Sequence, residues 1–334
     1  MTVAELRRFA ADLGLDVVGA AAAEPYAQTE RHIRERRTRG LFADMRFTMA
    51  RPEVSCHPEL LLDGARSVVA AALCYYARAA EPDIDQGRLP RYTWRDEYTT
   101  LRERLEALGQ RLGGSYRVLV DENDHVDREA AVRAGVAFYG KNTMAITRRH
   151  GSWVVLGTLV TDVEIERSPP LELDCGSCRL CIDACPTGAL DDPGVLDATK
   201  CLSYWTQAAS PVPEEHRRDL RDTVYGCDIC QDVCPWNRGV EKRRAGMQVP
   251  DDAQPTVSLR EWLDGDEAGL IAEFDRLYVP SNDARWLRRN ALIAAGNVAT
   301  DDLIPSVERH AAGDDTMLSE TATWALARMA ERSA

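Results

Sequence analysis

Most of the side chains that could do chemistry lie in two cysteine-rich runs. The first, CGSCRLCIDACP, begins at Cys175 with the spacing C-x2-C-x2-C-x3-C-P, and the second, CDICQDVCP, begins at Cys227 and has one cysteine fewer. Cys201 stands between them, so eight of the ten cysteines lie within 175–234. The first spacing is that of bacterial ferredoxins, whose thiolates hold cubane iron–sulfur clusters. The sequence therefore predicts a domain that carries two such clusters.

The ferredoxin spacing also predicts which thiolates share a cluster. Three closely spaced cysteines surround one cubane, and the fourth, followed by proline at a helix start, reaches the neighbouring cluster. Cluster one then receives Cys175, Cys178, Cys181 and Cys234, and cluster two receives Cys185, Cys201, Cys227 and Cys230. Two zinc sites are the alternative, but zinc sites ordinarily use separated C-x2-C pairs and do not need this crossed pattern. We favour two 4Fe–4S clusters, with Cys56 and Cys74 left outside them and Cys74 buried in a strand.

The elements expected ahead of the cysteines form an α/β unit over residues 1–165. Apolar and β-branched runs predict strands, and leucines at helical spacing predict helices. The predicted strands are 65–77, 116–123 and 151–162, and the predicted helices are 98–112 and 127–140. Gly135 is a candidate for ending the second of these helices.

The beginning of the chain bears on its cellular location. Apolar residues at helical spacing run from Leu6 to Val17, with Asp12 and Asp16 among them, so we expect an amphipathic helix and not a twin-arginine export signal. No apolar run there approaches the roughly 18–20 residues that span a bilayer. These observations predict a cytoplasmic protein with no membrane association, in which a disulfide framework is not expected.

Two further units are predicted after the first, and the fold class is therefore α+β. Residues 166–240 form the ferredoxin-like cluster domain, and 241–334, opened by a linker over 241–255, form a helical domain. LRRNALIA from Leu287 and LSETATWA from Leu318 share a leucine followed by alanines four and seven residues later, which indicates HEAT-like repeats, with a plain helical bundle as the alternative. No coiled-coil pattern is present, and we expect a monomer.

Several motifs together resemble one family over nearly the whole chain. They are the cluster region CGSCRLCIDACPTGAL…KCLSYWTQ…YGCDICQDVCPWN, the block LVDENDHVDREAAVRAGVAFYGKNTMAI, the strand GSWVVLGTLVTD and the C-terminal RRNALIAAGN. In this combination the chain resembles the epoxyqueuosine reductases. The resemblance implies a cytoplasmic enzyme that holds cobalamin beside two 4Fe–4S clusters and reduces epoxyqueuosine in tRNA to queuosine. It also implies an N-terminal domain similar to that of reductive dehalogenases, helical repeats that hold the anticodon arm, and an electron donor such as a flavodoxin or ferredoxin system.

The resemblance also implies roles for particular residues. Asp121, in the Val-Asp pair, is the expected proton donor, and Asp127 is the second candidate, although it could serve as a helix N-cap instead. A donor needs a raised pKa, from burial or from neighbouring negative charge. Without the resemblance, these acids read as solvated loop residues. The residues expected to border the corrin are Lys141, Asn142, Ala145 and Leu156.

The net charge of −13 does not exclude a tRNA substrate, because backbone binding needs only local basic groups. The residues expected to contact tRNA phosphates are Arg285, Arg288 and Arg289. Thr99, in RYTWRDEYTT, departs from a histidine common in the family, which leaves a related substrate open. Two other functions compete: a cobalamin-dependent reductive dehalogenase of a small molecule, and a ferredoxin-like electron carrier.

Overall fold

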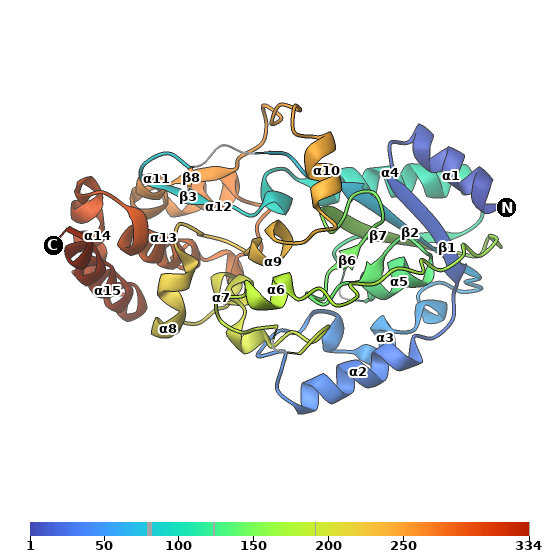
Figure 1. Ribbon diagram of the computed structural model, residues 1–334, viewed down its shortest axis with the longest axis horizontal. Coiled ribbons are helices and arrows are strands. Elements are labelled where there is room, and N and C mark those ends of the chain that lie inside the picture. The colour runs from blue at the N-terminus through green and yellow to red at the C-terminus, as the bar shows by residue number, and fades with distance from the viewer. Residues whose placement is uncertain (79–81, 123, 191, 334) are drawn as a thin grey trace.

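The computed structural model describes residues 1–78, 82–122, 124–190 and 192–333. The molecule is elongated, with the N-terminal sheet unit at one end, the C-terminal helices α13 to α15 at the other, and the cysteine-bearing segments between them (Figure 1). No helix within the described ranges is long and apolar enough to cross a membrane.

The N-terminal unit is built around a four-stranded sheet in the order β1-β2-β7-β4. These strands are β1 (Val17–Ala22), β2 (Ser67–Cys74), β4 (Tyr116–Leu119) and β7 (Val154–Thr161). Each neighbouring pair is antiparallel; Ala70, for example, stands opposite Gly19 on one side and Thr158 on the other. The mixed helix and strand class is confirmed, but this unit has an antiparallel sheet and not the parallel sheet of an α/β unit.

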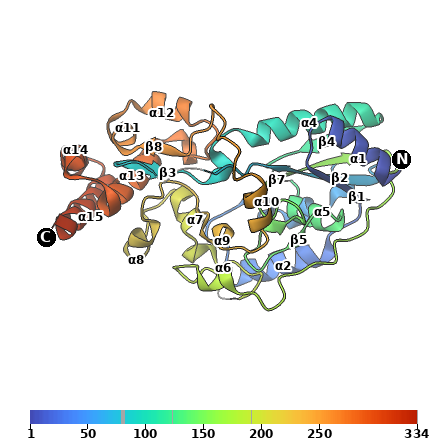
Figure 2. The ribbon, with the colours of Figure 1, turned by 45° about the horizontal axis from the view of Figure 1, so that its top comes forward.

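Helices cover both faces of the sheet, with α4 (Glu97–Leu112) on one side and α5 (Asp127–Arg133) on the other (Figure 2). The two central strands, β2 and β7, are therefore buried along their whole length. Two glycines allow this close packing of helices on the sheet. A Cβ at Gly157 would lie 2.7 Å from Leu105, and one at Gly19 would lie 2.0 Å from the Ala134 carbonyl oxygen. The backbone contact at Gly19 leaves no room for a methyl group, whereas a methyl group at Gly157 would have to displace the end of the Leu105 side chain.

Most predicted elements of this unit are confirmed, with shorter ends. Helix α4 matches 98–112; Asp96 caps it by accepting from the Thr99 amide at 2.9 Å. Helix α5 ends at Arg133, two residues before Gly135, whose φ of +65° is a left-handed conformation that favours glycine. The predicted first helix was too long, because α1 (Val3–Asp12) stops before a turn at Gly14 and Val17 begins strand β1. Asn123, the last residue of the predicted 116–123 strand, lies outside the described residues.

The other elements of the first half are short. They are α2 (Ala27–Thr38), η1 (Phe47–Met49), α3 (Pro52–Ser55), η2 (Pro58–Leu60), β3 (Gln86–Arg88), η3 (Arg91–Thr93), β5 (Phe138–Tyr139) and β6 (Ala145–Ile146). The cysteine-bearing segment contains α6 (Leu180–Asp183), η4 (Ala198–Lys200), α7 (Leu202–Gln207), α8 (Glu214–Arg217), η5 (Arg218–Leu220), α9 (Ile229–Asp232) and α10 (Arg238–Arg243). Because α10 extends to Arg243, the first residues of the predicted linker are helical.

The C-terminal helices pack on one another through the repeated positions seen in the sequence. Leu287 and Ala291 of α13 are buried, as are the corresponding Leu318 and Ala322 of α15. This end of the chain comprises β8 (Thr256–Ser258), α11 (Leu259–Asp264), α12 (Glu267–Glu273), η6 (Pro280–Asn282), α13 (Arg285–Val298), η7 (Asp301–Leu303), α14 (Ile304–Ala311) and α15 (Thr316–Ser333).

A segment from the first half of the chain completes the C-terminal unit. Strand β3 pairs with β8, and Leu89 and Trp94 are buried in the same apolar core as α11 and α13. The residues just after Trp94 return to the sheet unit through α4. The segment 86–98 therefore crosses between the two ends of the molecule, and it passes the cysteine-bearing loops on the way.

Candidate functional site

The first predicted set of thiols surrounds one cavity. Its lining includes the side chains of Cys175, Cys178, Cys181 and Cys234, together with Lys141, Asn142, Ile146, Pro235 and Trp236. Cys234 comes from the second run, so the crossed pairing expected from the ferredoxin spacing brings distant segments together here. Burial raises the pKa of Cys181 and of Cys234, and neighbouring thiols of the same set raise both further.

The second predicted set also gathers, around the N-terminus of α7. Burial raises the pKa of Cys227 to about 12, and the neighbouring Cys201 and Cys185 add to that rise. The pKa of Cys230 is likewise raised by burial and then by Cys227 and Cys201. Clustered, buried thiols resist ionisation until a cation binds them. Within the described residues, no three His, Cys, Asp or Glu side chains lie close enough together to hold a single metal ion.

Two residues expected at the corrin instead hold the cysteine loops. Lys141 Nζ donates to the carbonyl oxygens of Gly176 at 2.6 Å and Cys178 at 2.8 Å. Asn142 Nδ2 donates to the carbonyl of Cys230 at 3.4 Å, which connects it with the second thiol set. Both side chains are thus engaged with the loops of the thiols. The other two, Ala145 and Leu156, are buried in β6 and β7.

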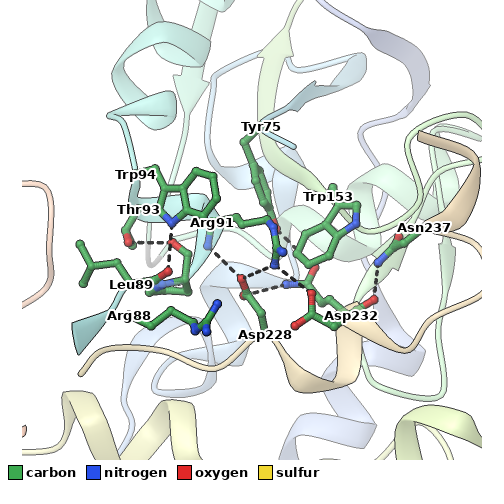
Figure 3. Close-up of polar contacts among 12 residues, drawn as sticks. Tyr75, Arg88, Leu89, Arg91, Thr93, Trp94, Trp153, Asp228, Asp232 and Asn237 are labelled. Carbon is green, nitrogen blue, oxygen red and sulfur yellow. Dashed lines mark hydrogen bonds and ion pairs between the residues drawn. The ribbon is translucent and has the colours of Figure 1, made fainter. Parts of the chain in front are cut away.

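Arg91 ties the second cysteine loop to the segment 86–98 (Figure 3). Its amide donates to Asp228 Oδ2 at 2.9 Å, and its guanidinium contacts the same oxygen at 3.3 Å and Asp232 Oδ1 at 2.8 Å. The guanidinium also lies 4.8 Å from the ring centroid of Trp153, a cation–π contact. Asp228 stands between Cys227 and Cys230, so Arg91 fixes the position of that loop.

A second group of hydrogen bonds extends this junction to the sheet. Asn237 Nδ2 donates to the Gln231 carbonyl at 2.7 Å, and its Oδ1 accepts from the Ser152 amide at 2.8 Å. Tyr75, at the end of β2, donates to Gln231 Oε1 at 3.3 Å. All of these polar groups are buried, and such networks rigidify a structure when they are satisfied. The second cysteine run is therefore held against the sheet unit.

Asp121 lies in the loop that follows β4 and has a left-handed backbone, with φ of +53°. Its carboxylate has no hydrogen bond or ion pair within the described parts of the chain. The side chain is exposed, yet the surrounding protein still raises its pKa, first by desolvation and then through the charge of Glu122, with Arg102 opposing. A carboxyl group with these properties suits a proton donor. Strained backbone of this kind is often found at functional sites.

Tyr92 links the two halves of the site. Burial raises its pKa first, followed by the charges of Asp228 and Asp121, so both carboxylates act on this one phenol. Asp121 also raises the pKa of Tyr98 and of Tyr225. Three tyrosines, Tyr92, Tyr98 and Tyr225, therefore lie near enough to Asp121 for its charge to affect them, and Tyr92 is also affected by Asp228 of the cysteine loop. The sequence drew attention to this segment only through Thr99 and did not predict Arg91 or the tyrosines.

Contacts hold the loop that carries Asp121 at three of its described residues. Arg102 donates to the Val120 carbonyl at 2.7 Å, Asp124 pairs with Arg51 at 2.6 Å, and the Val126 amide donates to the Ser55 carbonyl at 3.1 Å. His125 is buried, and desolvation lowers its pKa to about 4, so it is neutral.

Asp127, the second candidate donor, is the first residue of α5, and Val126 is the N-cap. Its Oδ1 accepts from the Arg128 amide at 2.7 Å. Burial raises its pKa, while Arg128 opposes this. Asp127 is thus engaged by the helix, whereas Asp121 is free of such bonds within the described residues.

The three arginines expected at tRNA phosphates lie in different environments. Arg285 is about half exposed and pairs with Asp283 at 2.5 Å, and Arg288 is largely buried and donates to the Gly265 carbonyl at 2.9 Å. Arg289 is fully buried and binds backbone carbonyls of the α7 region. A guanidinium without exposed surface cannot contact a phosphate, so the prediction for Arg289 is wrong.

Comparison with known sequence families agrees with the thiol geometry. Residues 174–237 match the family described as a 4Fe-4S double cluster binding domain. This match resolves the choice between clusters and zinc in favour of two 4Fe–4S clusters, and it defines the class: an iron–sulfur protein in which a double-cluster domain lies between a sheet unit and a helical unit. Residues 56–125 match a second family, described as epoxyqueuosine reductase QueG.

Full-length relatives and solved structures point to the same family. The epoxyqueuosine reductase of Lactococcus garvieae is 31% identical over 97% of this chain and 95% of its own length, and that of Bacillus subtilis is 30% identical over 98% and 87%. A crystal structure of an epoxyqueuosine reductase with an epoxyqueuosine-modified tRNA-Tyr stem loop has a TM-score of 0.86 at 30% identity, covering 98% of this chain and 89% of that one. The structure of an epoxyqueuosine reductase from Bacillus subtilis, described with its catalytic aspartate loop swung out of the active site, has a TM-score of 0.86 at 29% identity. It covers 98% of this chain and 90% of that one. The chain belongs to the epoxyqueuosine reductase family.

Proposed function

We propose that this chain reduces epoxyqueuosine in tRNA to queuosine. One observation carries the proposal: the charges of Asp228, in the loop of the second thiol set, and of Asp121 both act on the buried phenol of Tyr92. The proposed electron source and proton source are therefore both near Tyr92, and we place the substrate pocket there. Removing the epoxide oxygen as water and leaving an alkene consumes two electrons and two protons, so the reaction needs both sources.

The thiols supply the ligands for the electron relay. We assign Cys175, Cys178, Cys181 and Cys234 to one 4Fe–4S cluster and Cys185, Cys201, Cys227 and Cys230 to the other. We propose that the second set is the nearer one, because Asp228 of its loop accepts from the amide of Arg91, the residue before Tyr92, at 2.9 Å. The electrons would come from an external donor such as a flavodoxin or ferredoxin system, which is a prediction, as are the cytoplasmic location and the monomeric state.

Cobalamin is the third proposed cofactor, and the pocket residues fit it in part. Asp121 is exposed with no partner in the described residues, whereas Ala145 and Leu156 are buried in their strands and present little surface to a ligand. Lys141 and Asn142 would border the group only through the cysteine loops that they hold, because their donors are already used. When bound there, cobalamin would supply the reducing centre for the epoxide.

Asp121 is the residue that we propose to protonate the departing oxygen. Its raised pKa increases the protonated fraction near neutral pH, and its lack of partners leaves the carboxyl free to turn toward a substrate. In the Bacillus subtilis structure the catalytic aspartate loop is swung out of the active site, and we propose that the Asp121 loop can likewise take more than one position. Here Arg102 and the Asp124–Arg51 pair hold the loop in place.

The RNA would bind at the exposed surface around this pocket. We retain Arg285 as a proposed phosphate contact because its side chain is about half exposed, and Arg288 as a weaker one. The view of α13 and α15 as HEAT-like repeats that support the anticodon arm is also a proposal, supported by the matching buried positions Leu287 and Leu318.

A turnover assay tests the function. The protein is purified without air, loaded with iron, sulfide and cobalamin, and mixed with a chemical reductant and tRNA that carries epoxyqueuosine. Conversion to a nucleoside lighter by one oxygen, identified by mass spectrometry after digestion, is the expected result. No conversion by protein whose cluster and cobalamin contents are complete would overturn the proposal.

A further inference from the structure

Two exposed aromatic rings meet at the junction of the two ends of the molecule. The ring centroids of Phe47 and Tyr278 are 6.1 Å apart in an edge-on arrangement. Phe47 belongs to η1 in the first half of the chain, and Tyr278 precedes α13. They are nevertheless 43% and 56% exposed. Large apolar rings that contact each other and remain exposed often mark a binding surface.

The backbone next to each ring is hydrogen-bonded to a segment that belongs to the proposed active site. The Tyr278 carbonyl accepts from the Tyr225 hydroxyl at 3.1 Å, and Tyr225 is one of the tyrosines that the charge of Asp121 affects. On the other side, the Thr48 carbonyl accepts from Ser55 Oγ at 2.7 Å. The segments that carry the two rings are therefore joined to Tyr225 and to Ser55, beside the proposed pocket.

The segment of Phe47 is also joined to the loop of Asp121. The Ser55 carbonyl accepts from the Val126 amide, and Arg51 pairs with Asp124 of that loop. Phe47 itself has φ of +25°, and Ser281 and Asn282 near Tyr278 have φ of +55° and +50°. Non-glycine residues rarely adopt these conformations, and they persist where surrounding contacts impose them.

The chemistry around the two rings suits a nucleobase. Arg46, next to Phe47, is exposed and makes no ion pair within the described residues, so a cation stands beside the rings. Proteins bind single-stranded RNA by stacking unpaired bases on aromatic side chains while basic groups contact the backbone. A nucleotide delivered to the Asp121 pocket must leave the stack of its loop, which exposes the faces of its neighbours.

We infer that Phe47 and Tyr278 form a stacking site for the anticodon-loop base next to the modified nucleotide, an inference that rests on the proposed function. Stacking one base on an aromatic side chain contributes enough binding energy to change affinity by about 5- to 150-fold. The site would hold the anticodon loop so that its modified nucleotide enters the proposed pocket.

Binding of a fluorescein-labelled anticodon stem loop that carries epoxyqueuosine tests this site. We expect Phe47→Ala and Tyr278→Ala to raise Kd by about 5-fold or more, and Tyr278→Phe, which keeps the ring, to stay within about twofold of the unaltered protein. Leu60→Ala, at an apolar residue that is even more exposed (69%), is the control and should bind normally. Iron and cobalamin contents should be unchanged in all variants.

A second RNA, with an abasic site next to the modified nucleotide, identifies the stacked group. The abasic RNA should bind the unaltered protein about as weakly as the intact RNA binds Tyr278→Ala. Tyr278→Ala should bind the abasic RNA with little further loss of affinity. Equal affinities of all proteins for the intact RNA, or loss of cobalamin with RNA binding unchanged, would overturn the inference. If the unaltered protein converts the tRNA and the alanine variants bind normally, the stacking site alone fails; if the unaltered protein neither binds nor converts it, the proposed function fails as well.

Discussion

Replacing Arg289 should destabilise the protein and disturb the second cluster, with no direct effect on RNA. Its guanidinium is fully buried and donates to the carbonyls of Ala208 at 2.7 Å, Trp205 at 2.9 Å and Thr206 at 3.2 Å, and also to that of Ser210. No carboxylate within the described residues pairs with it. Desolvation lowers its pKa to about 9, so the group remains a cation at neutral pH.

The size of the effect follows from these acceptors. Each buried carbonyl left without a donor costs about 1–3 kcal/mol, and four of them would cost roughly 4–12 kcal/mol if none were hydrated. Removing a buried charge returns several kcal/mol of desolvation free energy. We therefore expect a net loss of about 3 kcal/mol for Arg289→Ala, which is a large part of the 5–15 kcal/mol typical of folded proteins.

Thermal unfolding of the cluster-loaded protein, with iron analysis, measures this loss. Arg289 binds carbonyls at the end of α7, whose N-cap is the proposed ligand Cys201, so iron should be lost from Arg289→Ala first. Arg288→Ala, which removes one bond to Gly265, is the control and should cost under about 1 kcal/mol. Normal stability and iron content in Arg289→Ala, together with weakened tRNA binding, would refute this account and restore Arg289 as a phosphate contact.

Three further substitutions test the site. Asp121→Asn should lower kcat by about 100- to 10,000-fold, and Asp127→Asn should lower it far less. Because the donor must be protonated, the activity of the unaltered enzyme should fall as pH rises through the raised pKa of Asp121. The same fall in activity with pH in Asp121→Asn would contradict the assignment. Arg91→Gln removes the cationic partner of the largely buried Asp228 and should lower the free energy of unfolding by about 2–4 kcal/mol. Arg95→Gln, at an exposed ion pair, is the control and should lower it by under about 1 kcal/mol. Equal losses would show that Arg91 does not hold the cysteine loop. Cys201→Ser should leave about half of the iron, and full iron content would exclude it as a ligand.

The sequence was most informative where spacing and local chemistry decide the outcome. The ferredoxin pattern predicted which thiols gather, because ligand spacing around a cubane is constrained by geometry. The periodic leucines of α4 and the apolar run of β2 were likewise recognised. Strand β1 was missed because VVGAAA is short and follows directly on an amphipathic helix, so its apolar residues continue the helical pattern.

Long-range contacts account for what the sequence could not give. Arg91 and Asp228 are far apart in the chain, and nothing in either segment indicates that they pair. Arg289 resembled a surface cation because its neighbours are basic, and only the tertiary structure shows that carbonyls near α7 surround it. Lys141 was expected at the corrin, and its observed partners are backbone carbonyls of the first cysteine loop, which the sequence did not indicate.

A single-turnover experiment tests the central claim most directly. The unaltered protein and Asp121→Asn, with equal iron and cobalamin contents and both pre-reduced, are mixed with a limiting amount of tRNA that carries epoxyqueuosine. The nucleosides are then weighed as a function of time. We predict rapid loss of one oxygen in the unaltered protein and a rate at least about 100-fold lower in Asp121→Asn. Equal rates in the two proteins would contradict the role of Asp121, and no oxygen loss in either would contradict the proposed reaction itself.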